Sequence, residues 1–523
     1  MSNNITVGLD IGTSKICALI AAPNLEDQTL KVLGIGIAES EGLNRGVVVN
    51  IDKTVGAIRK VVAQAELQAG VKVTEVVIGI AGDHVELIQT RGIIGISNPT
   101  GEITKKDVDR LLEETKKINI PSERKIIHVI PQEYIIDGQD GITDPIGMSG
   151  VRLEANVNIV TGLTTAIQNL YRCVERCGLK VKDLVLEPVA SSAAVLTRDE
   201  KEVGVVMIDI GGGTTDIAIF EENILRFTSV FGIAGKHVTD DIRKVLGIIA
   251  NQAERIKREY GHTHLESIMQ DEVFMIPGIA GRKPTEAHKS FLCQIIQARM
   301  EELFQFAEIE IKRSGLAHRL GAGVVITGGT TLLKGSEKLA SEVFGMPVKI
   351  GIPTHISYSG LAPEVESPLY ATAVGLALYG MKDMKALDMM MDPLADSFII
   401  TNEINSNSVK DSYLEQNNQE QDNLNGNENS DEILDSEGLN IDNEIIEKDE
   451  IQSIKEKTKL SKKDDGFMSK FSKRFTGKEK SDFDKIEKAK TSDEFEPDTK
   501  EEKENEKPKV KLGDRIIKML EEL

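Results

Sequence analysis

Long apolar runs are missing from this 523-residue sequence, and cysteine is scarce. No stretch of 18 or more residues is apolar throughout, whereas a membrane-spanning helix needs about 20. We therefore expect any membrane contact to be peripheral. The four cysteines show neither Cys-x-x-Cys nor Cys/His metal-site spacing: Cys17, Cys173, Cys177 and Cys293. They are expected to be reduced thiols in a cytosolic protein.

Basic residues are in the minority, and no export signal is visible. The sequence has 63 lysines and arginines against 84 aspartates and glutamates, a formal net charge of −21. Duplex nucleic acid is recognised through a basic face, so this balance argues against nucleic acid as a main partner. The first ten residues pass into a strand pattern without a basic or apolar leader, so secretion is not expected.

Up to about residue 385, apolar strand-like runs alternate with helical patterns. The runs are Val76–Ile80, Val203–Ile208 and Val324–Ile326, and the helical patterns include Thr54–Ala69 and Ala253–Tyr260. This alternation predicts an α/β body.

The last quarter of the chain differs in composition. Residues 393–523 carry a net charge of −12, against −9 for the first 392 residues. Residues 401–460 are rich in Asn, Glu and Asp and show no apolar period. Such a composition buries too little apolar surface to offset the entropy lost on ordering. We therefore predict a disordered acidic linker over 393–508.

One internal repeat stands out in the body. Val7–Ile20 and Met207–Phe220 each read as an apolar strand ending in Asp-Ile-Gly, a turn of small residues and a second apolar strand. The repeat predicts two β-hairpins whose tips are built from Gly, Ser and Thr.

These tips are candidates for binding phosphate. Backbone N–H groups of a Gly-rich turn can point at one anion, with no Cβ in the way. Asp10 and Asp209 precede the turns and are predicted to hold Mg²⁺, mostly through its waters. The remaining candidates are Gly12, Thr13, Ser14 and Lys15 in the first hairpin, and Gly211, Gly212, Gly213, Thr214 and Thr215 in the second. The alternatives are an ordinary tight turn and, for Lys15, an exposed hairpin lysine.

Two further Gly-rich patterns bear on nucleotide binding. The turn Gly211–Asp216 lacks the Lys-Ser/Thr ending of a Walker loop and leads into a strand rather than a helix. A third Gly-rich turn, with Gly328, Gly329 and Thr330, follows the strand at Val324. It is either an ordinary strand-to-helix corner or a contact with an adenosine. The histidines form no ligand cluster, so no metal other than Mg²⁺ is indicated.

Together, Asp10-Ile-Gly-Thr13, Asp209-Ile-Gly-Gly-Gly-Thr214 and Thr327-Gly-Gly-Thr330 resemble the phosphate and adenosine motifs of the actin, sugar-kinase and heat-shock-chaperone ATPase superfamily. Within it the sequence resembles the FtsA family of bacterial cell-division proteins. Three further segments carry that resemblance: Ile130–Gly150, Leu186–Ala194 and Ser367–Gly375. It covers residues 5 to about 385.

The resemblance implies an α/β, actin-like two-lobed ATPase fold with an inserted 1C subdomain, followed by the disordered tail and an amphipathic helix. The implied divisions are subdomain 1A at 1–83, 163–197 and 359–392, 1C at 84–162, 2A at 198–225 and 305–358, and 2B at 226–304. It also implies ATP and Mg²⁺ as ligands.

Subdomain 2B is implied to dock the C-terminal tail of FtsZ. Arg299, in the helix Ile295–Phe306, matches a basic position that meets this acidic tail, with Glu302 one turn on; we expect Arg299 to be an exposed rim charge. The first helix of 2B is expected to contain Ala253–Lys257, with Glu254 and Lys257 near the ribose and base. The paired glycine of the family appears here as Ala234-Gly235, which leaves Gly235 for close approach to phosphate.

Glu187 has two interpretations. By resemblance it stands where relatives place the group that orients the attacking water, which makes it the catalytic candidate. It also fits an ordinary carboxylate at a helix N-terminus, followed by Pro188 at the first helical turn. Slow or absent ATP turnover is therefore expected.

The end of the chain predicts an amphipathic helix over 509–523. Its apolar residues fall at helical spacing: Leu512, Ile516, Met519, Leu520 and Leu523. A long linker separates it from the body, so we interpret it as an interfacial membrane helix, as the resemblance also implies. Phe467–Phe475 interleaves three phenylalanines with basic residues and fits either an anionic lipid surface or a solvated basic patch.

The sequence thus predicts an ATP-binding protein on the inner face of the membrane that tethers FtsZ and assembles into filaments. A metabolic kinase of the same superfamily is the alternative, although no sugar-binding pattern is visible. A chaperone ATPase would need a substrate domain after residue 385, where only the acidic linker is predicted.

Overall fold

The computed structural model describes residues 5–24, 29–276, 278, 283–357, 361–381 and 399–400. All of them belong to the first of two units, Met1–Asn418 and Gln419–Leu523. The predicted linker, the Phe467–Phe475 segment and the C-terminal helix lie outside the described residues, except for Ile399 and Ile400.

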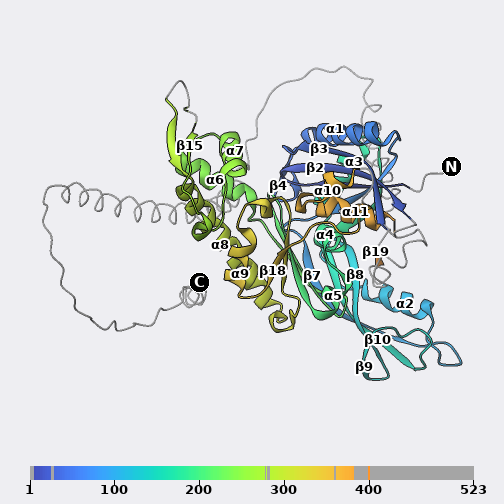
Figure 1. Cartoon of the computed structure of the whole chain (residues 1–523). Helices are drawn as coiled ribbons and strands as arrows, with labels where there is room; N and C mark the ends of the chain where they lie inside the picture. The colour runs from blue at the N-terminus through green and yellow to red at the C-terminus, as the bar shows by residue number, and fades with distance from the viewer. Residues whose placement is uncertain are drawn as a thin grey trace, which may run out of the picture. The chain divides into compact units, whose positions relative to one another are not determined.

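Two five-stranded sheets of the same topology form the two lobes (Figure 1). The first has the order β11-β6-β1-β2-β3, with β11 (Lys180–Leu186), β6 (Glu75–Ile80), β1 (Thr6–Ile11), β2 (Lys15–Asn24) and β3 (Thr29–Glu39). The second has the order β18-β17-β12-β13-β14, with β18 (Val348–Ile350), β17 (Val324–Thr327), β12 (Val205–Ile210), β13 (Thr215–Glu221) and β14 (Ile224–Phe231). In each sheet the first three strands are parallel to one another, and each of the last two strands is antiparallel to the strand before it. The predicted pair of hairpins is confirmed as β1–β2 and β12–β13.

Helices cover the first sheet where glycines let them approach. Helix α1 (Ile51–Ala69) begins at Asn50, whose side chain accepts a hydrogen bond from the Lys53 N–H, and ends at Gly70, whose φ is +66°. Its apolar stripe packs on β3 beside Gly36, where a Cβ would overlap the Val61 backbone. The other helices of this lobe are α3 (Thr164–Glu175), α4 (Glu187–Val195), α10 (Ala362–Val365) and α11 (Ala371–Gly380).

An inserted subdomain lies between β6 and α3 in the chain. Its sheet has the order β19-β8-β10-β7, with β7 (Glu86–Gly95), β8 (Arg124–Ile136), β9 (Gln139–Ile142), β10 (Arg152–Leu163) and β19 (Ile399–Ile400); β9 also pairs with β8. Helix α2 (Lys105–Thr115) covers one face through a separate apolar core that includes Leu111 and Leu153. Its first turn is closed by a capping box between Thr104 and Asp107.

The second lobe carries its own helical addition. Between β14 and β17 stand α6 (Gly235–Leu246), α7 (Ala250–Tyr260), the hairpin β15 (Val273–Ile276) and β16 (Thr285–His288), and α8 (Lys289–Arg313). The remaining elements are β4 (Leu43–Asn44), β5 (Val47–Val48), α5 (Arg198–Val203), α9 (Ser336–Phe344) and the short 3₁₀ turns η1 (Leu265–Ser267), η2 (Ala317–Arg319), η3 (Gly329–Leu332) and η4 (Pro368–Tyr370). The predicted boundaries at 225/226 and 304/305 fall inside β14 and α8. The strand predicted at Val203–Ile208 is shifted, because Val203 ends α5 and β12 begins at Val205.

Candidate functional site

The two hairpins border a cavity of about 500 Å³ between the lobes. The cavity is lined by seventeen of the eighteen predicted site residues: Asp10, Gly12, Thr13, Ser14, Lys15, Glu187, Asp209, Gly211, Gly212, Gly213, Thr214, Gly235, Glu254, Lys257, Gly328, Gly329 and Thr330. Segments up to about 320 residues apart in the sequence thus converge on one site. Its volume is in the range of small-molecule pockets.

Thr215 is the exception. It is the first residue of β13, and its hydroxyl donates to the Ile233 carbonyl at 2.7 Å. Its side chain is buried in the lobe and is not part of the cavity wall, so the structure places it in a packing role. Alternation along β13 explains this, because Asp216, the next residue of the strand, lines the cavity and Thr215 therefore lies on the other face.

Glycine is required where the hairpin tips meet. A Cβ at Gly212 would overlap the Ser14 side chain, and one at Gly213 would overlap Thr13. The turns are closed by hydrogen bonds from Gly12 N to the Lys15 carbonyl and from Gly211 N to the Thr214 carbonyl, both 3.0 Å. The absence of side chains at these tips leaves backbone N–H groups beside the cavity, as a phosphate site requires.

Lys15 is not an exposed hairpin lysine. Its ammonium lies 2.9 Å from Asp10 Oδ2 and donates to the Leu369 carbonyl at 2.6 Å, and its side chain is 18% exposed. Burial alone would lower the pKa of Lys15, but the charge and hydrogen bond of Asp10, together with the charges of Cys17 and Asp209, outweigh it, so the pKa is raised and the lysine stays charged.

Asp209 is held by two hydroxyls that sequence reasoning did not identify. Ser191 Oγ donates to Asp209 Oδ2 at 2.6 Å, and Thr372 Oγ1 donates to the same oxygen at 3.3 Å. Burial nevertheless raises the pKa of Asp209. Ser191 lies within the Leu186–Ala194 segment noted above, but nothing in its spacing from Asp209 predicted the contact.

Asp216 was also missed. It lines the cavity, it is 3% exposed, and its Oδ1 has no hydrogen-bond partner. Burial and the charge of Asp209 hold the pKa of Asp216 well above its usual range. Burial and the nearby Asp10 do the same to the pKa of Glu187. The signal available for Asp216 was its position in the second hairpin motif, two residues after Thr214.

These carboxyls fit a hydrated cation. One cavity is lined by four carboxyl side chains, with Lys15 as a nearby positive charge: Asp10, Glu187, Asp209 and Asp216. One of their oxygens, Asp216 Oδ1, is buried and has no hydrogen-bond partner. Within the described ranges, no group of three or more His, Cys, Asp or Glu side chains is arranged to hold a metal ion directly. A magnesium ion that keeps its waters and also binds phosphate would match this set.

The helices of the second lobe complete the wall. The backbone N–H groups of Gly235 and Lys236 donate to the Gly211 and Gly212 carbonyls at 3.1 and 2.8 Å. The Lys236 ammonium crosses to the first lobe and donates to the Thr13 carbonyl at 2.9 Å. Lys236 was not predicted, although it follows Gly235 directly.

Glu254 and Lys257 lie one turn apart on α7 and form an ion pair of 2.7 Å. Lys257 also donates to the Thr239 hydroxyl at 2.9 Å, and Thr239 donates to Glu254 at 2.5 Å. Burial lowers the pKa of Lys257, although the Glu254 carboxylate opposes this. The expectation that the first helix of this region contains Ala253–Lys257 is wrong, because α6 precedes α7 and begins at Gly235.

The third Gly-rich turn closes the cavity from β17. Gly328 has a φ of +89°, and a Cβ there would overlap Asp209 and Ile210. Thr330 Oγ1 donates to the Gly211 carbonyl at 2.7 Å, which joins this turn to the second hairpin.

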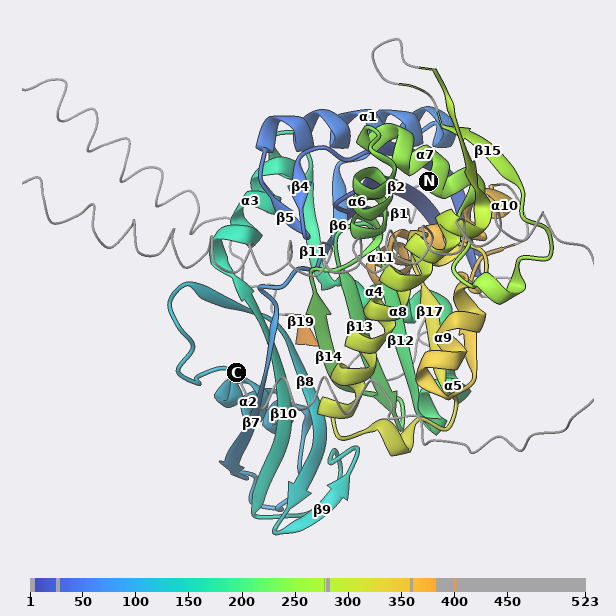
Figure 2. The same cartoon turned by 90° about the vertical axis from the view of Figure 1, so that its left-hand side faces the viewer.

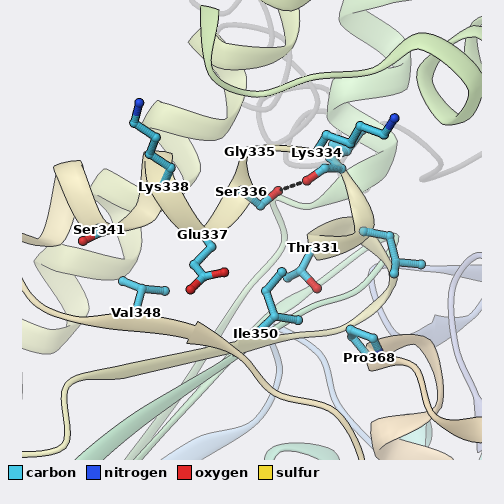
Figure 3. A pocket seen from close by; sticks show the side chains of 12 residues that line it. Thr331, Lys334, Gly335, Ser336, Glu337, Lys338, Ser341, Val348, Ile350 and Pro368 are labelled. Carbon is cyan, nitrogen blue, oxygen red and sulfur yellow. Dashed lines mark hydrogen bonds between the residues drawn. The ribbon is translucent and has the colours of Figure 1, made fainter. Parts of the chain in front are cut away.

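A second cavity, of about 590 Å³, shares Leu332, Leu333, Lys334 and Pro368 with the first. Figure 3 shows Glu337 directed into it and Lys338 directed away. The buried hydroxyls of Thr331 and Ser336 already donate to the Gly328 and Leu333 carbonyls. These hydroxyls are therefore not available to a ligand in the way that Asp216 is in the first cavity.

Arg299 differs from its prediction. Its guanidinium binds both oxygens of Asp241 on α6, at 2.5 and 3.1 Å, and it also pairs with Glu302. Its side chain is 20% exposed and that of Asp241 is 8% exposed. The expectation of an exposed rim charge is wrong, because a residue 58 positions earlier supplies the partner that fixes α8 to α6.

The four cysteines are free thiols, and burial raises the pKa of the Cys17 thiol to about 12. Among the residues that the structure describes, no helix is both long and apolar enough to cross a bilayer.

The fold and the cavity define a class: two lobes of one topology with Gly-rich hairpins facing each other across a cleft, as in actin-like proteins. The chain aligns in structure with the PilM–PilN type IV pilus biogenesis complex, with a TM-score of 0.53 over 72% of this chain and 98% of that chain. Sequence identity there is 17%, so this likeness concerns the fold alone.

Comparison of sequences gives the family. The family model "Cell division protein FtsA" matches residues 206–375, and "SHS2 domain inserted in FTSA" matches residues 82–161. The chain is 43% identical to cell division protein FtsA of Pseudomonas aeruginosa over 381 residues, 73% of this chain and 90% of that protein. It is 44% identical to cell division protein FtsA of Neisseria meningitidis serogroup B over 369 residues, which cover 70% of this chain and 88% of that protein. The chain belongs to the FtsA family of cell division proteins.

Proposed function

We propose that this cell-division protein binds ATP with Mg²⁺ in the cavity between the lobes. The observation that carries the proposal is the convergence of both hairpins, the Gly328–Thr330 turn and α7 on one cavity. Each hairpin would supply backbone N–H donors to the phosphates, and Asp10 and Asp209 would hold waters of the cation. Glu254 and Lys257 would face the ribose and base.

The bound cation would neutralise the phosphates and polarise them. The chain's own part is to place charge around them: Lys15 and Lys236 as cations, and Asp10 and Asp209 as anions toward the metal. Glu187 would orient a water, but burial and the nearby charge of Asp10 raise its pKa, which disfavours the ionised form that could accept a proton from that water. We therefore propose slow turnover or none, with binding rather than hydrolysis as the main role.

The proposal extends to partners. From the resemblance to the family, we propose that subdomain 2B docks the acidic tail of FtsZ and that the body assembles into filaments. Residues 509–523 would attach the protein to the inner face of the membrane at the division site. The ion pairs of Arg299 with Asp241 and Glu302 mean that an acidic tail would compete with these two carboxylates for the guanidinium.

Nucleotide binding is tested with Asp209→Ala and Gly212→Val, measured by titration calorimetry with ATP and Mg²⁺. We expect each to weaken binding at least tenfold, or about 1.4 kcal/mol. Asp240→Ala is the matched control, because Asp240 is half exposed on α6 and pairs with Arg243. Unchanged affinity in both hairpin variants would overturn the two-hairpin site.

FtsZ docking is tested with Arg299→Glu and Arg299→Lys against an FtsZ tail peptide at low salt. The reversal should weaken tail binding and also destabilise the α6–α8 contact, whereas lysine keeps the charge and loses the two-pronged pairing. Thermal unfolding separates the two effects. Wild-type tail affinity in a folded Arg299→Glu protein would place the docking face elsewhere.

A further inference from the structure

The inserted subdomain meets the second lobe at two irregular strand positions. In β8 the register against β10 skips Gln132, and in β14 the register against β13 skips Arg226. Each is therefore the extra residue of a β-bulge, a device that turns a side chain out of the regular ladder. Figure 2 shows β14 running beside β8.

The two bulges exchange hydrogen bonds. Gln132 Nε2 donates to the Leu225 carbonyl, and Arg226 Nη1 donates back to the Gln132 carbonyl, each at 3.0 Å. Asn158 of β10, 2% exposed, adds a bond of 3.0 Å from its Nδ2 to the Arg226 carbonyl. We call Gln132, Asn158 and Arg226 the bulge clasp.

Acidic neighbours in the second lobe hold the arginine in place. Glu222 lies 2.6 Å from Arg226 Nη2, and Glu221 lies 3.9 Å from its Nε. Glu221 also pairs with Arg319 at 3.1 Å. The guanidinium is thus oriented from the lobe-2 side before it reaches the inserted subdomain.

The inserted subdomain is consequently attached twice. Its chain enters and leaves through the first lobe, between β6 and α3, whereas the clasp joins it to β14 of the second lobe. Any change in the angle between the lobes must therefore either move the subdomain or break the clasp. β14 ends at Phe231, and the chain reaches Gly235 nine residues after Arg226. The Gly235 N–H donates to the Gly211 carbonyl of the second hairpin.

We propose that the bulge clasp transmits occupancy of the cavity to the inserted subdomain, with Arg226 as its positioning residue. The proposal rests on the proposed binding of ATP. A ligand that contacts both hairpins alters the relation of the lobes, and the doubly attached subdomain responds because its sheet is tied to both. Coupling between two such sites is reciprocal, and values of about 5- to 150-fold are usual.

The test is hydrogen–deuterium exchange of the full chain with and without Mg²⁺ and a non-hydrolysable ATP analogue. In the wild type, exchange should slow at both hairpins and change at least about fivefold in β8 and β10. In Arg226→Ala and in Gln132→Ala, the hairpins should still be protected and the response of β8 and β10 should be lost. Arg319→Ala is the matched control, since Arg319 shares Glu221 but does not reach the inserted subdomain.

The outcomes separate the two proposals. Hairpins that the analogue does not protect in the wild type would overturn ATP binding, and this coupling with it. Protected hairpins with no response in wild-type β8 and β10, or an unchanged response in a folded clasp variant, would overturn the coupling alone. Gln132→Ala serves if Arg226→Ala does not fold, because it removes a single hydrogen bond between the inserted subdomain and β14 and no charge.

Discussion

Burial raises the pKa of Glu187 in the folded protein above that of the unfolded chain, which lies near 4.5. Above that pH the folded protein binds a proton that the unfolded chain releases. This carboxyl therefore lowers stability as pH rises from about 4.5 towards its folded pKa, by at most about 1.4 kcal/mol per pH unit.

Glu187→Gln should accordingly stabilise the nucleotide-free protein at pH 8 by roughly 1 kcal/mol and have little effect at pH 5. Urea unfolding at the two pH values measures this difference. Glu123→Gln, which removes an exposed carboxylate, is the matched control. An equal effect of Glu187→Gln at both pH values would contradict the raised pKa.

Single residues also show what sequence reasoning can reach. The hairpin glycines and the two leading aspartates were predictable because a motif repeats within the chain. Ser191, Thr372 and Lys236 were not, because their roles depend on contacts made through the fold. Arg299 was misjudged for the same reason: its exposure is decided by Asp241 on another helix.

At the scale of elements, the crossing of α4 and α11 controls the position of Glu187. A Cβ at Gly375 on α11 would overlap the backbone of Ala190 on α4, so only glycine lets the two helices touch there. Helix α4 begins at Glu187, and any shift of the helix is carried to the cavity.

Gly375→Ala should therefore destabilise the protein by roughly 1–3 kcal/mol, as overpacked sites do, and weaken nucleotide binding as well. The same change at Gly56, in the middle of α1, meets no atom within 4 Å. Gly56→Ala should stabilise by roughly 0.5–1 kcal/mol, because alanine is the better helix former. Thermal unfolding of the two variants measures both changes in stability. If both variants were destabilised, the role given to Gly375 at the crossing of α4 and α11 would be contradicted.

Elements with a regular apolar pattern were predicted well, whereas elements that begin in a Gly-rich turn or contain a bulge were not. Helix α1 was predicted as Thr54–Ala69 and is observed as Ile51–Ala69, because its apolar stripe is regular. Helix α6 was overlooked since it starts at the Ala234-Gly235 turn, which was interpreted only as a phosphate approach. The bulges at Gln132 and Arg226 have no signature in the sequence of one strand. They can be recognised only from the register between that strand and its neighbour.

At the scale of the whole molecule, attachment to the membrane should depend on assembly. The five apolar side chains named above for residues 509–523, with Ile517 at the edge of the predicted face, are each worth at most roughly 1.5–3 kcal/mol when fully buried. Ordering the backbone opposes this by roughly 1–2 kcal/mol per residue before its own hydrogen bonds form. One copy should bind reversibly, and a filament with many copies should bind firmly.

Leu520→Glu places a charge on the predicted apolar face and should release the protein from liposomes in a flotation assay. ATP binding and FtsZ-tail binding should stay at wild-type levels, since the body is unchanged. If the variant still floats, the Phe467–Phe475 segment is removed next. Flotation of a protein that lacks both determinants would contradict the peripheral anchor.

The contact of Gly212 and Gly213 with Ser14 and Thr13 has a kinetic consequence. The hairpin tips already touch, so they act as a mechanical stop: the lobes can swing apart but cannot come closer at this point. If ATP binds in the cavity as proposed, its entry and its exit would share a single opening motion. A change that loosens the lobes should speed both steps together and leave the dissociation constant nearly the same, so exchange rate and affinity can be tuned independently in this fold.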